Sequence, residues 1–145
     1  MKDLQDFLKN NRYKKIKFSV LKTQHLLIKG KINGVLGNFI LDTGASNSCV
    51  GHEAVQKFQL KTENSNTKAA GAGATGMDTQ LSKNNILQLS YWKNAQFNLI
   101  VFDMSHVNLA LKEYKTKPVD GIIGADILLK GKAIIDYYNH YLYLK

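Results

Sequence analysis

Apolar and polar residues alternate in short segments along most of the chain. Residues 16–20 carry apolar side chains at every second position, which predicts a half-buried strand. Residues 25–32 and 35–41 have strand-like patterns on either side of Asn33-Gly34, a dipeptide typical of two-residue β-hairpin turns. The second of these predicted strands leads directly into residue 42.

Two more strand pairs follow from the same kind of pattern. Residues 86–91 and 95–102 are rich in apolar residues and flank a predicted turn at 92–94. Near the C-terminus, residues 133–137 and 141–144 surround a turn at Asn139-His140. Many short strands with turn signals between them indicate an all-β closed or sandwich-like barrel.

Helical patterns are few and short. Leu4, Phe7 and Leu8 follow the i, i+3, i+4 spacing of an amphipathic helix, which we expect over residues 3–10. A second short helix is predicted over 52–58. The chain has no internal repeat and a single proline, so the pattern favours one domain.

Composition agrees with a globular domain. Of the 145 residues, 44% are hydrophobic and 21% are charged, which argues against disorder. No apolar run approaches the roughly 20 residues of a membrane span, and the charged N-terminus does not have the apolar core of a signal peptide. The lone Cys49 suits a reducing compartment, and its apolar neighbours predict burial. We therefore expect a cytoplasmic protein, unless the chain is a trimmed form of a longer precursor.

The net charge of +9 comes from lysines spread along the chain. They form local groups at 14–17 and 112–117, but no nucleic-acid-binding motif accompanies them. A solvated lysine-rich surface accounts for most of this charge. The functional alternative is attraction of acidic peptides or partners.

Candidate chemistry is concentrated at Asp42-Thr43-Gly44, directly after an apolar strand. This position puts a carboxylate on a tight turn at the end of a buried element, where a charge is costly unless it is paired or hydrogen-bonded. A second apolar strand at 119–123 closes on Gly124 and is followed by a short helical pattern. Between these two features lies a stretch of very small residues, 69–76.

In this order, the three features resemble the retropepsins, the single-lobe branch of aspartic proteases that includes the retroviral enzymes. The resemblance runs from about residue 25 to the C-terminus. It implies a retropepsin-like aspartic protease domain over 25–145 and an N-terminal extension over 1–24 with a short helix and a strand. The implied fold is a closed acid-protease barrel with one or two short helices, assembled as a two-fold homodimer.

The need for a dimer also follows from the chemistry. Peptide hydrolysis by this route uses one ionised carboxylate to deprotonate a water and one protonated carboxyl to donate to the scissile carbonyl. The chain has one Asp-Thr-Gly. Asp120 is a conceivable second acid, but it has no Thr-Gly after it to shape a catalytic turn. A homodimer that places Asp42 against its symmetry mate supplies the pair.

The resemblance assigns roles to the neighbours of Asp42. Thr43 would bond across the dimer axis, and Gly44 would let a substrate backbone approach closely. Ala45 stands where two-lobed relatives usually carry a hydroxyl that bonds to the carboxylate, so we expect a pH optimum in mild rather than strong acid. Ile122 would line an apolar subsite.

Further site residues follow from the same resemblance. Ile123, Gly124 and Asp126 would support the active turn from beneath. The flap that covers a bound peptide would include Gly71, Ala72, Gly73 and Ala74. Retroviral enzymes usually have Arg and Asn after the apolar-apolar-Gly, where this chain has Ala125 and Asp126.

The predicted activity is thus that of an aspartic endopeptidase acting on a peptide or protein substrate, with no cofactor and no metal. Four scattered histidines and one cysteine give no zinc-binding spacing. Two other classes of function are open at this point. One is a non-catalytic domain that keeps the fold for peptide binding or dimerisation, and the other is a basic nucleic-acid binder.

Overall fold

The computed structural model describes residues 2–64, 69–71, 74–77 and 79–145. The strands are β1 (Lys14–Val20), β2 (Leu26–Ile32), β3 (Val35–Leu41), β4 (Cys49–Val50), β5 (Glu63–Asn64), β6 (Ala69–Gly71), β7 (Ala74–Met77), β8 (Gln80–Leu89), β9 (Trp92–Val101), β10 (Gly121–Ile123), β11 (Ile134–Asp136) and β12 (Tyr141–Leu144). The helices are α1 (Lys2–Asn10), α2 (Glu53–Lys57), α3 (Ser105–Glu113) and α4 (Ala125–Lys130).

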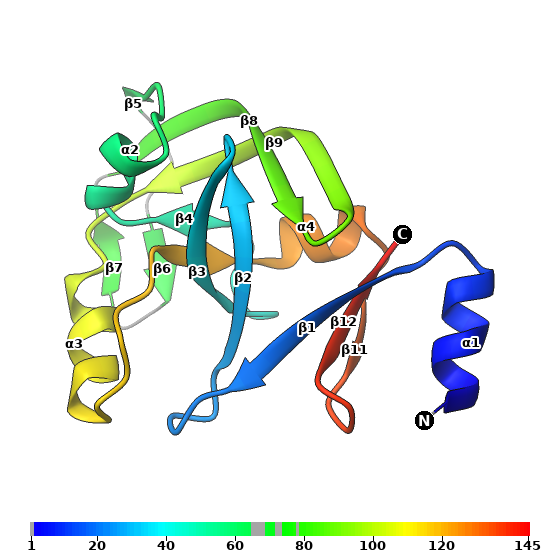
Figure 1. Cartoon of the computed structure of the whole chain (residues 1–145). Coiled ribbons are helices and arrows are strands. Elements are labelled where there is room, and N and C mark those ends of the chain that lie inside the picture. The colour runs from blue at the N-terminus through cyan, green and yellow to red at the C-terminus, as the bar shows by residue number, and fades with distance from the viewer. Residues whose placement is uncertain (1, 65–68, 72–73, 78) are drawn as a thin grey trace.

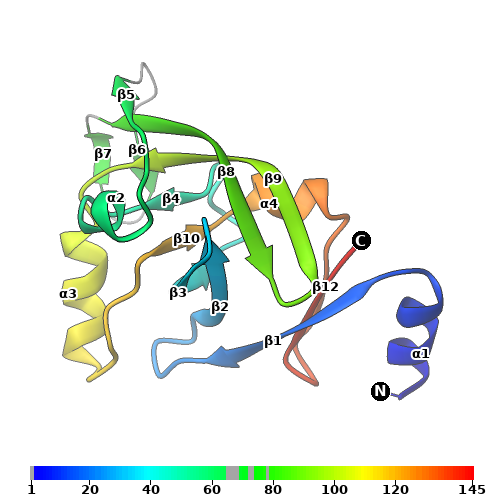
Figure 2. The same ribbon diagram turned by 45° about the horizontal axis from the view of Figure 1, so that its top comes forward.

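Six strands close into a barrel in the order β2-β3-β10-β4-β9-β8, because β2 also pairs with β8. The pairs β3–β10 and β4–β9 are parallel and the others are antiparallel. Figure 2 shows the long β8 and β9 passing above the short β4 and β10. The predicted closed all-β fold is confirmed, although the described residues form four short helices and α3 was not anticipated.

The predicted hairpin at Asn33-Gly34 is present between β2 and β3. Both turn residues have positive φ angles, 52° and 84°, as a two-residue turn of type I′ requires. The Asn33 side chain also binds outside the turn: its amide donates to the Phe58 carbonyl oxygen at 3.0 Å, and its oxygen accepts from the Ile86 amide at 2.9 Å. These two bonds hold the turn against Phe58 and Ile86, and so fix the start of β3, the strand that leads to Asp42.

A smaller sheet extends from the barrel. β1 pairs with β2 over Phe18–Val20 and with β12 over Lys14–Lys17, and β11 pairs with the far side of β12. Figures 1 and 2 show β1, β11 and β12 leaving the barrel together, with α1 beyond them. The N-terminal and C-terminal segments are thus joined in one sheet. The division of the chain at residue 25 stays a prediction.

The hairpin between β8 and β9 turns earlier than predicted. Its turn is at Ser90-Tyr91, and Trp92, expected in the turn, already pairs with Leu89. The Trp92 ring is only 7% exposed, whereas Tyr91 is 86% exposed. Burial of the large indole ring in the core decides the register, because a turn at 92–94 would have exposed it.

Apolar side chains form two clusters. The larger cluster fills the barrel and includes Phe39, Leu41 and Ile123. The second lies on the opposite face of the same strands, because Ile40 and Ile122 alternate with those residues. It consists of Ile40, Cys49, Ile100, Phe102, Met104, Leu111, Val119 and Ile122. Leu111 brings α3 onto this second face.

Candidate active site

Asp42 stands at the point where β3 ends. Its amide donates to the Ile123 carbonyl oxygen at 3.0 Å, which continues the parallel pairing of β3 with β10. Its carboxylate Oδ1 accepts a 2.8 Å hydrogen bond from the Gly44 amide. The side chain is half-buried, while Thr43 and Gly44 are exposed. The carboxylate is therefore fixed by backbone at its base and open on its other side.

The segment after β10 lies directly against this turn. The Ala125 amide donates to the Ala45 carbonyl oxygen at 2.7 Å. A Cβ on Gly124 would stand 2.5 Å from the same oxygen and 3.1 Å from the Asn47 carbonyl oxygen. Only glycine allows the two backbones to approach so closely. The structure thus brings Ile123 and Gly124 together with the turn at 42–45.

One polar residue at this site was missed by sequence reasoning. The Ser48 hydroxyl donates to Asp126 Oδ1 at 2.7 Å and accepts from the Gly124 amide at 2.9 Å. Ser48 is fully buried. It therefore joins the chain after the active turn to the start of α4. Local sequence carries no signal for this role, because its partners lie more than 75 residues away.

Asp120, the conceivable second acid, is engaged elsewhere. Its Oδ2 accepts from the Asn38 amide at 2.9 Å, and the Lys57 ammonium lies 2.9 and 3.0 Å from its two carboxylate oxygens. The Asp120 amide donates to the carbonyl oxygen of Asn38, a residue of β3 that is four positions before Asp42 in the sequence. At about 3.3 Å per residue, this separates the two positions by roughly 13 Å. Asp120 and Asp42 of one chain are too far apart to form a dyad.

Ile122 and Cys49 lie beside the turn in the second apolar cluster, against which Ala45 also packs. Ile122 is 5% exposed. Burial raises the pKa of the Cys49 thiol to about 12, and the nearby carboxylates of Asp126 and Asp42 add to the effect. Cys49 is thus a buried packing residue, as predicted.

The described parts of the small-residue segment form two paired strands. β6 and β7 are antiparallel, with Gly71 opposite Ala74 and Ala69 opposite Met77. This pair forms a separate sheet from the barrel. Ala72 and Gly73, both expected in the flap, lie outside the described residues.

The described residues contain no group of three His, Cys, Asp or Glu side chains that could hold a metal ion. None of the helices in the described part of the chain is long and apolar enough to cross a membrane.

A closed barrel with an Asp-Thr-Gly turn braced by an apolar-apolar-Gly strand defines a class of acid proteases. The family model described as aspartyl protease matches residues 28–127, more than two thirds of the chain. The chain therefore belongs to the aspartyl protease family, and its fold is of the retropepsin-like type. No curated protein matches the chain.

Solved structures with the same fold come from several sources. A retropepsin-like aspartic protease from Rickettsia conorii has a TM-score of 0.61 at 20% identity, covering 91% of this chain and 90% of that one. EIAV protease in complex with the inhibitor HBY-793 has a TM-score of 0.59 at 20% identity, covering 79% and 95%. The retroviral protease-like domain of Ddi1 from Leishmania major has a TM-score of 0.58 at 18% identity, covering 83% and 88%. At these identities the likeness concerns the fold.

Proposed function

We propose that the protein is an aspartic endopeptidase that acts as a homodimer, with Asp42 of each subunit meeting at the two-fold axis. The observation that carries this proposal is the placement of the carboxylates. Asp42 is held by Gly44 and by β10 with one side open, while Asp120 bonds to Lys57 and Asp126 bonds to Ser48. A second copy of Asp42 is the carboxylate that two-fold symmetry would supply.

In such a dimer the two Asp42 carboxyls would share one proton, because two adjacent carboxylates cannot both ionise. The ionised member takes a proton from a water, whose oxygen attacks the scissile carbonyl carbon. The protonated member donates to the carbonyl oxygen. Collapse of the tetrahedral intermediate breaks the C–N bond: the leaving amine takes up a proton from one carboxyl, and the other carboxylate takes a hydroxyl proton from the intermediate, which restores the one shared proton. Since Ala45 provides no hydroxyl beside the carboxylates, we expect optimal activity in mild acid.

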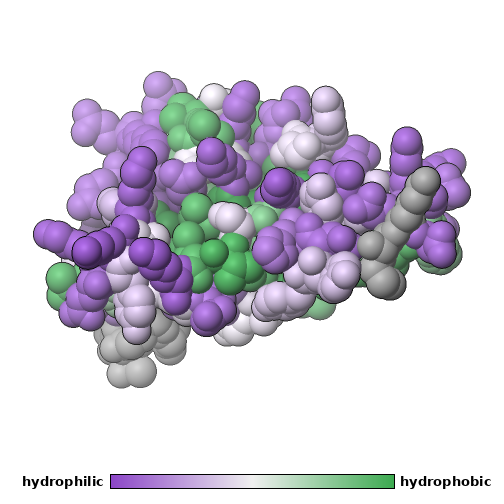
Figure 3. Space-filling view, turned by 60° about the horizontal axis from the view of Figure 1, so that its bottom comes forward, coloured by the Kyte–Doolittle hydropathy of each residue, from purple (hydrophilic) through white to green (hydrophobic). Residues whose placement is uncertain are grey.

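The substrate would bind as an extended peptide beneath the β6–β7 hairpin, which acts as the flap in this proposal. Backbone bonds of strand-addition type give affinity, and side-chain pockets give specificity. Ile122 belongs to the second apolar cluster beside the turn, which supports a preference for apolar residues next to the cleaved bond. Figure 3 views the molecule with the bottom of Figure 1 turned forward. Apolar side chains gather in the middle of this face, and hydrophilic side chains surround them. The exposed Thr43 is free to bond across the axis.

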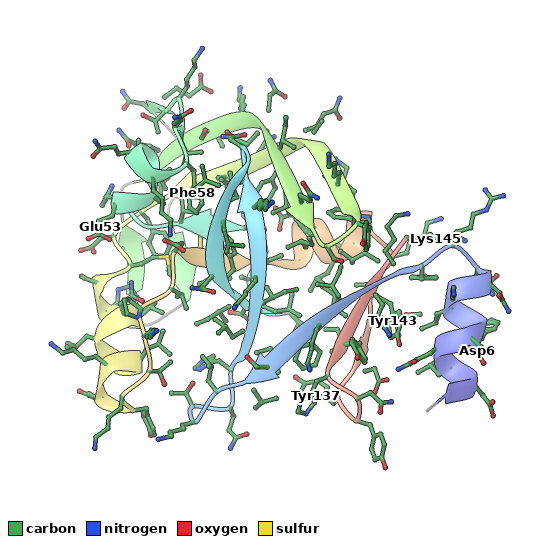
Figure 4. All side chains as sticks on the ribbon, viewed as in Figure 1. Asp6, Glu53, Phe58, Tyr137, Tyr143 and Lys145 are labelled. Atoms are coloured by element: carbon green, nitrogen blue, oxygen red, sulfur yellow. The ribbon has the colours of Figure 1, made fainter. Side chains whose placement is uncertain are left out.

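The C-terminal hairpin supports the proposed dimer contact. Tyr137 and Tyr138 follow β11 and are 63% and 83% exposed, and exposed aromatic residues are favoured at interfaces. Figure 4 shows Tyr137 near the free end of this hairpin and Tyr143 farther along β12.

The single cysteine suits the reducing environment of the cytoplasm, where we place the activity.

Cleavage of a peptide library between pH 4 and 7.5, read by mass spectrometry, tests the proposal for the wild type and Asp42→Asn. We expect cuts between apolar residues that disappear in the variant. Sedimentation of both proteins reports the oligomeric state. A stable dimer that cuts nothing across this pH range would overturn the endopeptidase proposal in favour of a non-catalytic peptide-binding domain. Equal cleavage by Asp42→Asn would overturn the assignment of Asp42.

A further inference from the structure

A recess of about 560 Å³ opens on the barrel wall between β1, β2, β3 and the end of β8. Its volume is within the range of small-ligand and peptide side-chain pockets. It adjoins the place where β1 leaves β2 to join β12. None of the residues assigned to catalysis lines it.

Three lysines dominate the recess. Lys29 and Lys31 lie on the same face of β2 as Leu27. Leu27 pairs with Ser19 of β1, and Lys17 lies two residues before Ser19, so all three lysines are on one face of the sheet. All three lysine side chains are exposed, and none forms an ion pair with a described acidic residue. Residues 7–41 contain eight basic residues and no acidic one. The lining of the recess therefore carries three positive side chains and no acidic one.

The recess also has an open strand edge. β1 pairs with β12 over Lys14–Lys17, but it pairs with β2 only over Phe18–Val20. The Phe18 amide donates to the His140 carbonyl oxygen, so it points towards β12. Because successive backbone groups in a strand point to opposite sides, the amides of Lys15 and Lys17 point away from β12. Of these two residues, Lys17 lines the recess. No described strand pairs with residues 14–17 on that side.

Apolar surface accompanies the charge. Leu36 lies opposite Lys31 on β3 and is 55% exposed, and the half-buried Leu27 continues the same face. A strand edge with lysines and leucines on one face suits an extended peptide with acidic and apolar side chains. A second copy of the chain fits poorly, because a two-fold contact here would oppose lysines with lysines.

We propose that this recess is an exosite that binds an extended acidic segment of a substrate or partner protein, added as a strand along residues 14–17 of β1. The acidic side chains pair with Lys17, Lys29 and Lys31, and an apolar side chain packs on Leu27 and Leu36. The site does not depend on Asp42, so it would operate in either a protease or a non-catalytic dimer. In a protease it would select substrates by a sequence outside the cleaved bond.

The test uses the full chain carrying Asp42→Asn, so that no peptide is cut. Fluorescence anisotropy measures binding of a labelled peptide of alternating Glu and Leu, and of a second peptide with Gln in place of Glu. A triple variant, Lys17→Gln with Lys29→Gln and Lys31→Gln, is compared with a control that changes Lys112, Lys115 and Lys117 to Gln and removes the same charge. We expect the first triple variant to bind the Glu peptide at least about tenfold more weakly, and the control to stay within about twofold.

Four further results sharpen the test. The Gln peptide should bind far more weakly, and the affinity for the Glu peptide should fall with added salt. Methylation of alternate peptide amides should abolish binding, because it removes strand hydrogen bonds. Carbodiimide cross-linking of the Glu peptide to unmutated lysines should map to Lys17, Lys29 and Lys31.

Several outcomes would overturn the exosite. Equal weakening in both triple variants would reduce the effect to general charge, and absence of binding would remove the site. Tighter binding of duplex DNA or anionic vesicles through the same three lysines would show that the ligand class is wrong. Circular dichroism confirms that each variant is folded before binding is compared.

Discussion

Ser48 and Asp126 are joined by a 2.7 Å hydrogen bond across 78 residues of sequence, directly beneath the active turn. The same hydroxyl accepts from the Gly124 amide. Because Ser48 and Gly124 are both buried, water cannot replace the hydroxyl at the Gly124 amide, whereas Asp126 is half-buried. This one side chain therefore connects the turn at Asp42, the strand that braces it and the helix that follows.

The first prediction concerns Ser48→Ala. The change leaves the Gly124 amide without its buried partner and removes a bond to the Asp126 carboxylate, so we expect a loss of about 1–3 kcal/mol in the free energy of unfolding. Cleavage should weaken too, because the turn that holds Asp42 loses its support. Urea denaturation and peptide cleavage measure the two effects. Ser46→Ala, in the same loop but exposed, is the matched control and should change neither.

The second prediction separates Asp120 from the catalytic chemistry. In Asp120→Asn an oxygen still accepts from the Asn38 amide, but the ion pair with the partly exposed Lys57 is lost. We expect a loss of about 1 kcal/mol or less, since solvent screens this pair. Cleavage at 25 °C should be retained, in contrast to Asp42→Asn. A folded Asp120→Asn protein without activity would show that Asp120 is part of the catalytic machinery.

Local patterns were sufficient to predict most of the barrel. The Asn33-Gly34 turn and the alternation before Asp42 are read within a few residues, because turn geometry and strand burial are local constraints. α3 was missed because only Leu111 of this helix is buried. Its position depends on Asn108, whose side chain bonds to the backbone of Val119, a contact that sequence periodicity does not encode.

The candidate site shows the same limit. Asp42 and Gly124 were identified because each belongs to a short motif, Asp-Thr-Gly or apolar-apolar-Gly. Ser48 and the Lys57–Asp120 pair have no such motif, and their partners are separated by 63 to 78 residues. The pairing of β10 with both β3 and β4 brings these segments together.

The third prediction tests the close approach at Gly124. The backbone of Gly124 is extended, so the constraint is space rather than dihedral angle. An added Cβ would meet the Ala45 carbonyl oxygen at 2.5 Å, and one backbone has to move. We expect Gly124→Ala to cost about 1–3 kcal/mol and to abolish most cleavage.

Gly51→Ala is the control for this change, because its Cβ would have its nearest neighbour, Met104 Cβ, at 3.6 Å. Thermal unfolding and kcat/KM of the two variants should therefore diverge. If Gly124→Ala matched Gly51→Ala in both, the tight contact would have no role in the turn.

The fourth prediction follows from the buried thiol of Cys49. Its pKa is about 12 in the folded protein, against an ordinary value of 9.0, so the unfolded chain releases this proton first as the pH rises. The folded state then binds more protons than the unfolded state, and stability falls between about pH 9 and pH 12. The slope approaches about 1.4 kcal/mol per pH unit within this window.

Urea denaturation at pH 8, 9 and 10 should show this fall in the wild type, and Cys49→Ala should lack the part that the thiol contributes. Below pH 9 the two proteins should differ only by a constant offset from the lost packing. Iodoacetamide should label Cys49 at pH 8 in urea but not in the native protein, since the buried thiol stays protonated. Rapid native labelling at pH 8, together with parallel stability curves, would show that the thiol is accessible and ionises as freely as in the unfolded chain.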